Sequence, residues 1–149
     1  MLEDTETKPD ADAMPSLNHS YICAQVLRQL LAHDAIQPLP ELTLAIGQGL
    51  APDISVYPRE RIQPDFFADV LRVEHLPVLA IEVISSSQAI QTVLDKARQL
   101  VEAGVEWVWV VEPYGRSIFV IGAGHRQLFH EEPVESAGIR VDFRQVFTR

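Results

Sequence analysis

The order of helical and strand-like segments in this 149-residue sequence predicts a mixed α/β fold, in which helices pack on a central β-sheet. Two nearly continuous apolar runs, residues 78–84 and 106–112, have the composition of central strands that are covered on both faces. Between them, residues 85–103 repeat apolar side chains at helical spacing. A chain of this length can bury the core of one domain and is too short for two.

The first expected element is a helix over Leu17–His33, where apolar residues recur at three- and four-residue steps and define one buried face. The proline-containing segment 37–40 is expected to end this helix. Residues 41–46 alternate in polarity and residues 53–57 form an apolar run, so the two segments predict a β-hairpin. Residues 58–77 are rich in charge and proline, and we expect a loop there.

The second half of the sequence continues with a helix and two strands. Ser85 and Gln88 have the S-x-x-Q spacing of a capping box, so a helix is expected to start here and to stop at Gly104. Residues 106–112 and 117–122 are expected to pair across the short turn between them. The remaining C-terminal segments are expected to close the domain.

Composition and charge limit the function classes. Hydrophobic residues make up 47% of the chain, and no apolar run reaches the roughly 18 residues that a membrane span needs, so we expect no membrane association. The net charge of −9 argues against a generic nucleic-acid binder. Residues 1–15 are acidic and polar, which predicts a disordered tail before a single domain over residues 16–149. They do not resemble a secretory signal, and we expect a cytoplasmic protein.

Three residues in these elements form a candidate catalytic set. Glu82 interrupts an apolar strand, and a buried carboxylate costs on the order of several kcal/mol unless it is paired or bound to a cation. Asp53 opens another strand, so the two carboxylates can meet at one edge of the sheet. Lys96 falls about 100° from the centre of the apolar stripe of its helix, and its long side chain can reach that edge. Each has an ordinary alternative, since Asp53 alone is typical of a turn cap and Lys96 alone of a surface lysine.

This set suits the hydrolysis of a phosphodiester. Two carboxylates with open positions favour Mg²⁺, with Mn²⁺ as a substitute, because this hard cation keeps several waters and binds phosphates. A nearby lysine can hold the scissile phosphate, and the metal lowers the pKa of a bound water.

Three segments carry the motifs of one family: "PDISVY" from Pro52, "VLAIEVISSS" from Val78, and "LDKARQLVEAGVEWVWVVEP" from Leu94. Together they resemble the Uma-two family of putative restriction endonucleases, a branch of the PD-(D/E)XK nuclease superfamily. The family pattern is P-D, a strand ending in E-V-L-S-P-S, a helix with Lys and Tyr before a Gly, and then E-Y-W-V-V-D-P. The resemblance covers roughly residues 17–149 and implies a restriction endonuclease-like fold, with a central mixed β-sheet flanked by helices.

The resemblance implies a Mg²⁺-dependent DNA endonuclease. Asp53 and Glu82 would be its catalytic metal ligands, the main-chain carbonyl of Val83 a third ligand, and Lys96 the catalytic lysine. The E-x-K motif of the superfamily would place the lysine at position 84, where this chain has Ile84. The family supplies the lysine from the helix, and Lys96 matches that position.

Two further departures weaken the argument for full activity while leaving the metal ligands intact. Leu100 replaces the tyrosine of the helix, and Glu112 replaces the aspartate that ends the next strand. The alternative function is therefore a catalytically inactive nuclease-fold module that binds nucleic acid or a protein partner. A purely structural α/β protein would leave Glu82 unexplained.

Several other residues have weaker assignments. His19 matches a family position and is a candidate to line the site, with a polar role at the helix start as the alternative. The five histidines show no spacing typical of zinc, and Cys23, the single cysteine, is expected to be an inert buried thiol. Arg59, Arg61 and Arg98 are candidate phosphate contacts, with solvated surface arginines as the alternative.

The number of candidate sites predicts the assembly. A DNA duplex has two strands and this chain has one candidate site, so we expect an isologous homodimer. Phe143 and Phe147 are candidate interface residues. Trp107 and Trp109 lie two apart on one strand and are expected in the core or an interface rather than stacked on bases.

Overall fold

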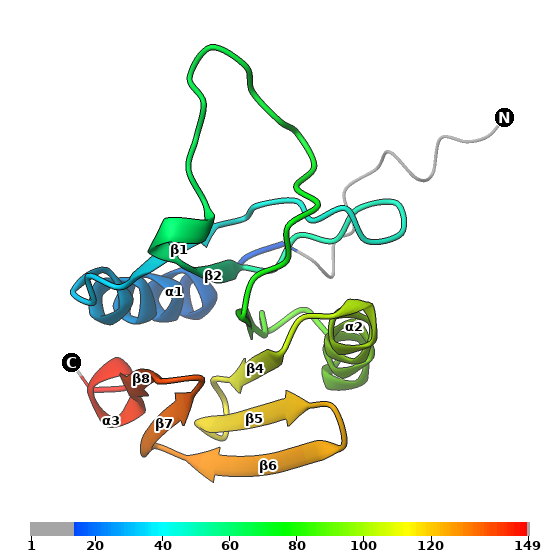
Figure 1. Cartoon of the computed structure of the whole chain (residues 1–149). Coiled ribbons are helices and arrows are strands. Elements are labelled where there is room, and N and C mark those ends of the chain that lie inside the picture. Colours follow the sequence, from blue (N-terminus) through cyan, green and yellow to red (C-terminus); the bar gives the residue numbers. More distant parts are fainter. Residues whose placement is uncertain (1–13, 149) are drawn as a thin grey trace, which may run out of the picture.

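A six-stranded sheet with the order β1-β2-β3-β4-β5-β6 forms the centre of the fold in the computed structural model, which describes residues 14–148 (Figure 1). Its strands are β1 (Ile36–Pro40), β2 (Ile54–Pro58), β3 (Leu79–Val83), β4 (Trp107–Glu112), β5 (Ser117–Gly122) and β6 (His125–His130). β3 and β4 are parallel, because the helix α2 (Ile90–Ala103) carries the chain back between them. The other neighbouring strands are antiparallel. This mixed sheet confirms the predicted fold class.

Two separate cores cover the two faces of the sheet. On one face lie α1 (Leu17–Leu31), α3 (Phe143–Val146) and a small second sheet of β7 (Pro133–Ser136) and β8 (Ile139–Asp142). On the other face lies α2. Strand β3 alternates between the two cores. Ile81 and Val83 face the core under α1, and Ala80 and Ile84 belong to the core under α2.

The predicted hairpin of residues 41–46 with residues 53–57 is wrong in its first strand. β2 pairs instead with β1, in a register that runs from Ile36 opposite Pro58 to Pro40 opposite Ile54. Residues 37–40 contain the prolines that predicted the end of the first helix, and the structure places them in β1. A strand tolerates proline here because β1 is the edge strand of the sheet, where a missing N–H group breaks no pairing. Residues 41–46 form no strand, and Leu44 makes isolated bridges to Leu50 and Val73.

The two long helices begin in different ways. α1 starts as expected near Leu17, and the side chain of Ser16 caps it by accepting a hydrogen bond from the His19 N–H at 3.2 Å. α2 starts at Ile90, later than the predicted capping box, with Ala89 as its N-cap and no capping side chain. The helix ends at Gly104, whose φ of 123° favours glycine.

Half of the predicted capping box is present as a turn before α2. The Oε1 atom of Gln88 accepts a hydrogen bond from the Ser85 N–H at 2.8 Å. The hydroxyl of Ser85 does not cap the helix, whose N-cap is Ala89; it donates instead to the Met14 carbonyl at 2.7 Å. This contact holds the start of the described chain against the end of β3. Apart from residues 14 and 15, the predicted acidic tail lies outside the described residues.

The predicted interface role of Phe143 is wrong, because this side chain is buried within the fold, whereas Phe147 is partly exposed. Phe143 has no exposed surface, and Phe147 packs against the same core. Trp109 is also fully buried, and its Nε1–H donates to Ser136 Oγ at 2.9 Å, which confirms a core role. Trp107 is partly buried against the same core.

Exposed apolar side chains gather instead in the long connection between η3 (Arg59–Arg61) and β3, which leaves the body of the sheet as a green loop in Figure 1. Phe66 is 92% exposed, Phe67 is 102% exposed and Leu71 is 87% exposed. Within residues 14–148, no helix has the length and apolar character for a bilayer span.

Candidate metal centre

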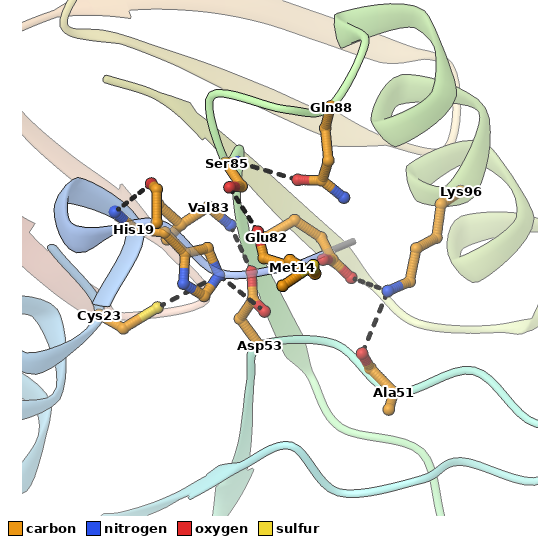
Figure 2. Close-up of polar contacts among 11 residues, drawn as sticks. Met14, His19, Cys23, Ala51, Asp53, Glu82, Val83, Ser85, Gln88 and Lys96 are labelled. Carbon is orange, nitrogen blue, oxygen red and sulfur yellow. Dashed lines mark hydrogen bonds and ion pairs between the residues drawn. The ribbon is translucent and has the colours of Figure 1, made fainter. Parts of the chain in front are cut away.

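The predicted acidic pair lies where β3 ends and β2 begins. The register of these strands pairs Ile54 with Ile81, so Asp53, one residue before β2, stands opposite Glu82. Both carboxylates therefore come from adjacent central strands at one end of the sheet, as the sequence predicts. Figure 2 shows them between His19, which comes from α1, and Lys96, which comes from α2.

Glu82 is a buried carboxylate with incomplete compensation. The residue is 5% exposed, and its Oε2 atom forms an ion pair with Lys96 Nζ at 3.0 Å. Apart from this ion pair, Oε2 has no hydrogen-bond partner among the described residues. Burial raises the pKa of Glu82 to about 7; Lys96 lowers this pKa and the nearby charge of Asp53 raises it further. A bound cation would supply the compensation that this carboxylate lacks.

Lys96 is held at the edge of the site rather than free on the surface. Its side chain is 30% exposed, and Nζ also donates to the main-chain carbonyl of Ala51 at 3.1 Å. Ala51 belongs to the loop that leads into Asp53, so the lysine connects α2 to that loop. The ammonium group thus reaches the sheet end, as its position beside the apolar stripe of the helix predicts.

Asp53 uses its two oxygens in two directions. Oδ2 accepts the Val83 N–H at 2.7 Å, and Oδ1 lies 3.1 Å from His19 Nε2. These contacts join Asp53 to β3 and to α1. A residue that only caps a local turn would bond to its own loop, so this alternative role does not describe Asp53. The side chain remains 22% exposed, so the carboxylate is open to a ligand from solvent.

His19 lies at the site, and Cys23 lies beside it. The hydrogen bond to Asp53 raises the pKa of His19, against the effect of burial. Cys23 Sγ lies 4.0 Å from His19 Nε2, and burial raises the pKa of this thiol to about 12. The interpretation of Cys23 as an inert thiol assumed that no histidine was near it, and this assumption is wrong. The sequence pattern that could have revealed the contact is the four-residue spacing of His19 and Cys23, which places both side chains on one face of the helix.

The three predicted phosphate contacts lie away from the acidic pair. Arg59 and Arg61 form part of η3, at the opposite end of β2 from Asp53, and a five-residue strand spans about 16 Å. Arg98 is exposed on α2 and pairs with Asp95. The structure therefore does not bring these arginines into the metal centre.

The two departures from the family pattern have structural roles here. Leu100 is fully buried in the core under α2. The carboxylate of Glu112 accepts the N–H groups of Tyr114 at 2.6 Å and Gly115 at 2.8 Å, and so caps the turn between β4 and β5. Neither side chain is a member of the acidic site.

The mixed sheet, with Asp53 and Glu82 at one end, has the architecture expected of a restriction endonuclease-like fold. The chain belongs to the Uma2 family, whose model, described as a putative restriction endonuclease, matches residues 10–145. A crystal structure of a putative nuclease belonging to DUF820, from Anabaena variabilis ATCC 29413, has a similar fold, with a TM-score of 0.77. The two sequences are 21% identical, over 95% of this chain and 87% of that chain, so this likeness shows the fold alone. A search of curated proteins found no match.

Proposed function

We propose that this chain is a Mg²⁺-dependent endonuclease that hydrolyses phosphodiester bonds in DNA. The observation that carries the proposal is Glu82, a carboxylate 5% exposed in a central strand, opposite Asp53 and paired with Lys96. A carboxylate buried in this way is costly in a purely structural protein. Membership of the family supports nuclease activity, whereas the metal and the DNA substrate are part of the proposal.

The residues at this end of the sheet fit Mg²⁺. Asp53 and Glu82 offer hard carboxylate oxygens, and the Val83 carbonyl is the third ligand that the resemblance implies. A divalent cation would offset both the burial of Glu82 and its repulsion from Asp53. When bound, Mg²⁺ supplies a water of lowered pKa and charge neutralisation at the phosphate.

Lys96 is the residue of this chain best placed to act on the phosphate. Its ammonium group is partly exposed, and Ala51 and Glu82 fix its position at the sheet end. A cation at this place stabilises negative charge as it develops on the phosphate oxygens. His19 orients Asp53 through the contact at 3.1 Å and is therefore a positioning residue.

Three substitutions and a matched control test the roles of the site residues. Plasmid cleavage and a calorimetric Mg²⁺ titration are compared for the wild type, Glu82→Gln, Asp53→Asn and Lys96→Ala. The first two should lose metal affinity and cleavage together. Lys96→Ala should cleave about 100-fold more slowly or worse and should keep or gain metal affinity, because a repelling cation is removed. Arg28→Ala, which removes an exposed cation near the far end of α1, should leave both properties unchanged.

The same measurements decide between the proposal and the inactive module. A module without catalytic function has no reason to keep a tight Mg²⁺ site, so a folded wild type that neither binds Mg²⁺ nor cleaves DNA would reject the proposal. Wild-type cleavage by Lys96→Ala would reject the role of the lysine alone.

We also propose that the enzyme is an isologous homodimer, with the loop that carries Phe66, Phe67 and Leu71 in its interface. These side chains are almost fully exposed in one protomer. The loop also carries Asp65 and Asp69, which would repel a DNA backbone. A second copy of the chain is therefore a better occupant of this apolar surface than nucleic acid.

A further inference from the structure

We infer that His19, Cys23 and Asp53 form a second metal site, which takes a thiophilic divalent cation such as Zn²⁺. Each residue offers one ligand atom, and these atoms all lie within 4.8 Å of one another. Within residues 14–148, this is the one group of three or more His, Cys, Asp or Glu side chains with that arrangement. The group has mixed nitrogen, sulfur and oxygen ligands, whereas the proposed Mg²⁺ ligands are all oxygens.

The distances suit a tetrahedral ion. Zn²⁺ bonds of about 2.0 to 2.3 Å place neighbouring ligand atoms about 3.3 to 3.7 Å apart. His19 Nε2 lies 3.1 Å from Asp53 Oδ1 and 4.0 Å from Cys23 Sγ, so the observed separations lie on either side of this range. Helix α1 fixes the first two ligands on one face at four-residue spacing, and the end of β2 brings the third.

The ligand chemistry selects against Mg²⁺ and in favour of softer metals. Thiolate and imidazole ligands suit Zn²⁺ and Co²⁺, whereas Mg²⁺ takes oxygen ligands. Three protein ligands leave a fourth position open to water. His19 Nδ1 is buried and has no hydrogen-bond partner among the described residues, unlike the supported histidines of permanent zinc sites. This site is therefore suited to reversible binding.

Asp53 couples this site to the proposed Mg²⁺ centre. Its Oδ1 atom faces His19, and its Oδ2 atom faces β3, where it accepts the Val83 N–H, so one carboxylate would serve both proposed ligand sets. A soft cation on Oδ1 would draw charge away from the Asp53–Glu82 pair and place a positive charge beside it. The two metals should therefore compete, and Zn²⁺ should inhibit cleavage. The inhibition rests on the proposed function, whereas the binding of the soft metal does not.

Cobalt titration of the metal-free, full-length protein under reducing conditions tests the ligand set. Cys23 is the single cysteine of the chain, so a thiolate-to-cobalt charge-transfer band in the near ultraviolet can come from no other residue. The wild type should show the band, and Cys23→Ser should abolish it. His19→Gln and Asp53→Asn should each weaken Co²⁺ binding tenfold or more. Glu82→Gln is the matched control and should keep the band, because Glu82 is outside this ligand set.

Each result supports or overturns one part of the inference. A folded wild type without the band would overturn the site, and so would a band whose midpoint is unchanged in His19→Gln and Asp53→Asn. Excess Mg²⁺ should raise the Co²⁺ concentration at the midpoint, and an unchanged midpoint would overturn the coupling through Asp53. A protein that shows the band but does not cleave DNA would reject the proposed function and support this site.

Discussion

Replacing Glu82 by Gln should make the metal-free protein more stable at pH 8 than the wild type, with a much smaller gain at pH 5. Burial is the main reason that the pKa of Glu82 rises from 4.5 to about 7. The folded protein therefore keeps a proton that the unfolded chain has already released. The ionisation of Glu82 therefore lowers the free energy of unfolding as the pH rises from about 4.5 to 7. Gln does not ionise, so the variant does not lose this stability.

The size of the effect follows from the two pKa values. The shift from 4.5 to about 7, at about 1.4 kcal/mol per pKa unit, corresponds to about 3 kcal/mol. About 2 to 3 kcal/mol of this falls between pH 5 and pH 8. The raised pKa of His19 has the same sign, because its contribution is present below its unfolded pKa and is lost as the pH rises through the folded value. His19 is present in both proteins, so its contribution largely cancels in the comparison.

Urea denaturation with EDTA present, at pH 5 and pH 8, measures this difference. The stability of Glu82→Gln minus that of the wild type should grow by about 2 to 3 kcal/mol between the two conditions. A difference that is the same at both values would refute the argument that the ionisation of buried Glu82 destabilises the metal-free fold. At pH 8, added Mg²⁺ should stabilise the wild type and have little effect on the variant, because the cation binds the folded state through this carboxylate.

Three further results are expected. In the cleavage assay, EDTA should abolish activity, and either Mg²⁺ or Mn²⁺ should restore it, while recovery by a monovalent salt would contradict the metal requirement. In light scattering, Phe66→Ser with Phe67→Ser should convert a dimer into a folded 16.7 kDa monomer whose unfolding midpoint no longer depends on protein concentration, and a wild-type monomer at micromolar concentration would exclude the dimer. In urea denaturation, Gly122→Ala should cost about 1 to 3 kcal/mol, because the new Cβ would lie 2.7 Å from the Trp107 ring, whereas no loss would show that the ring moves freely.

The strands and helices with a strong local pattern could be predicted from the sequence. β3, β4, β5 and α2 follow from apolar runs and one helical stripe, because for these segments local preference and burial agree. β1 could not be predicted in the same way. Its prolines are compatible with a strand only at the edge of a sheet, and the position of a strand within the sheet depends on pairing between distant segments.

The site was predictable where one residue violated its local environment. Glu82 was conspicuous in an apolar strand, and Asp53 followed from the meeting of neighbouring strand ends. Arg59 and Arg61 were misplaced, because they follow the strand of Asp53 in the sequence and the length of that strand separates them from Asp53 in space. The closeness of Cys23 to His19 was missed, although the two residues lie one helical turn apart, because the chain offers no second cysteine to suggest a metal.

The position of the lysine follows from the two-sided sheet. Glu82 shares a strand face with Ile84, which belongs to the core under α2 and is 5% exposed. A lysine at position 84 would enter that core and lose the solvation of its charge. Lys96 approaches from the helix that covers the same face, and it places Nζ 3.0 Å from Glu82 while its side chain stays 30% exposed. The Lys96 ammonium group thus reaches the Glu82 carboxylate from the edge of the helix, and its charge is not buried in the core beneath that helix. Within the proposed mechanism, the lysine therefore acts from the helix, and Ile84 fills the strand position as part of the core under α2.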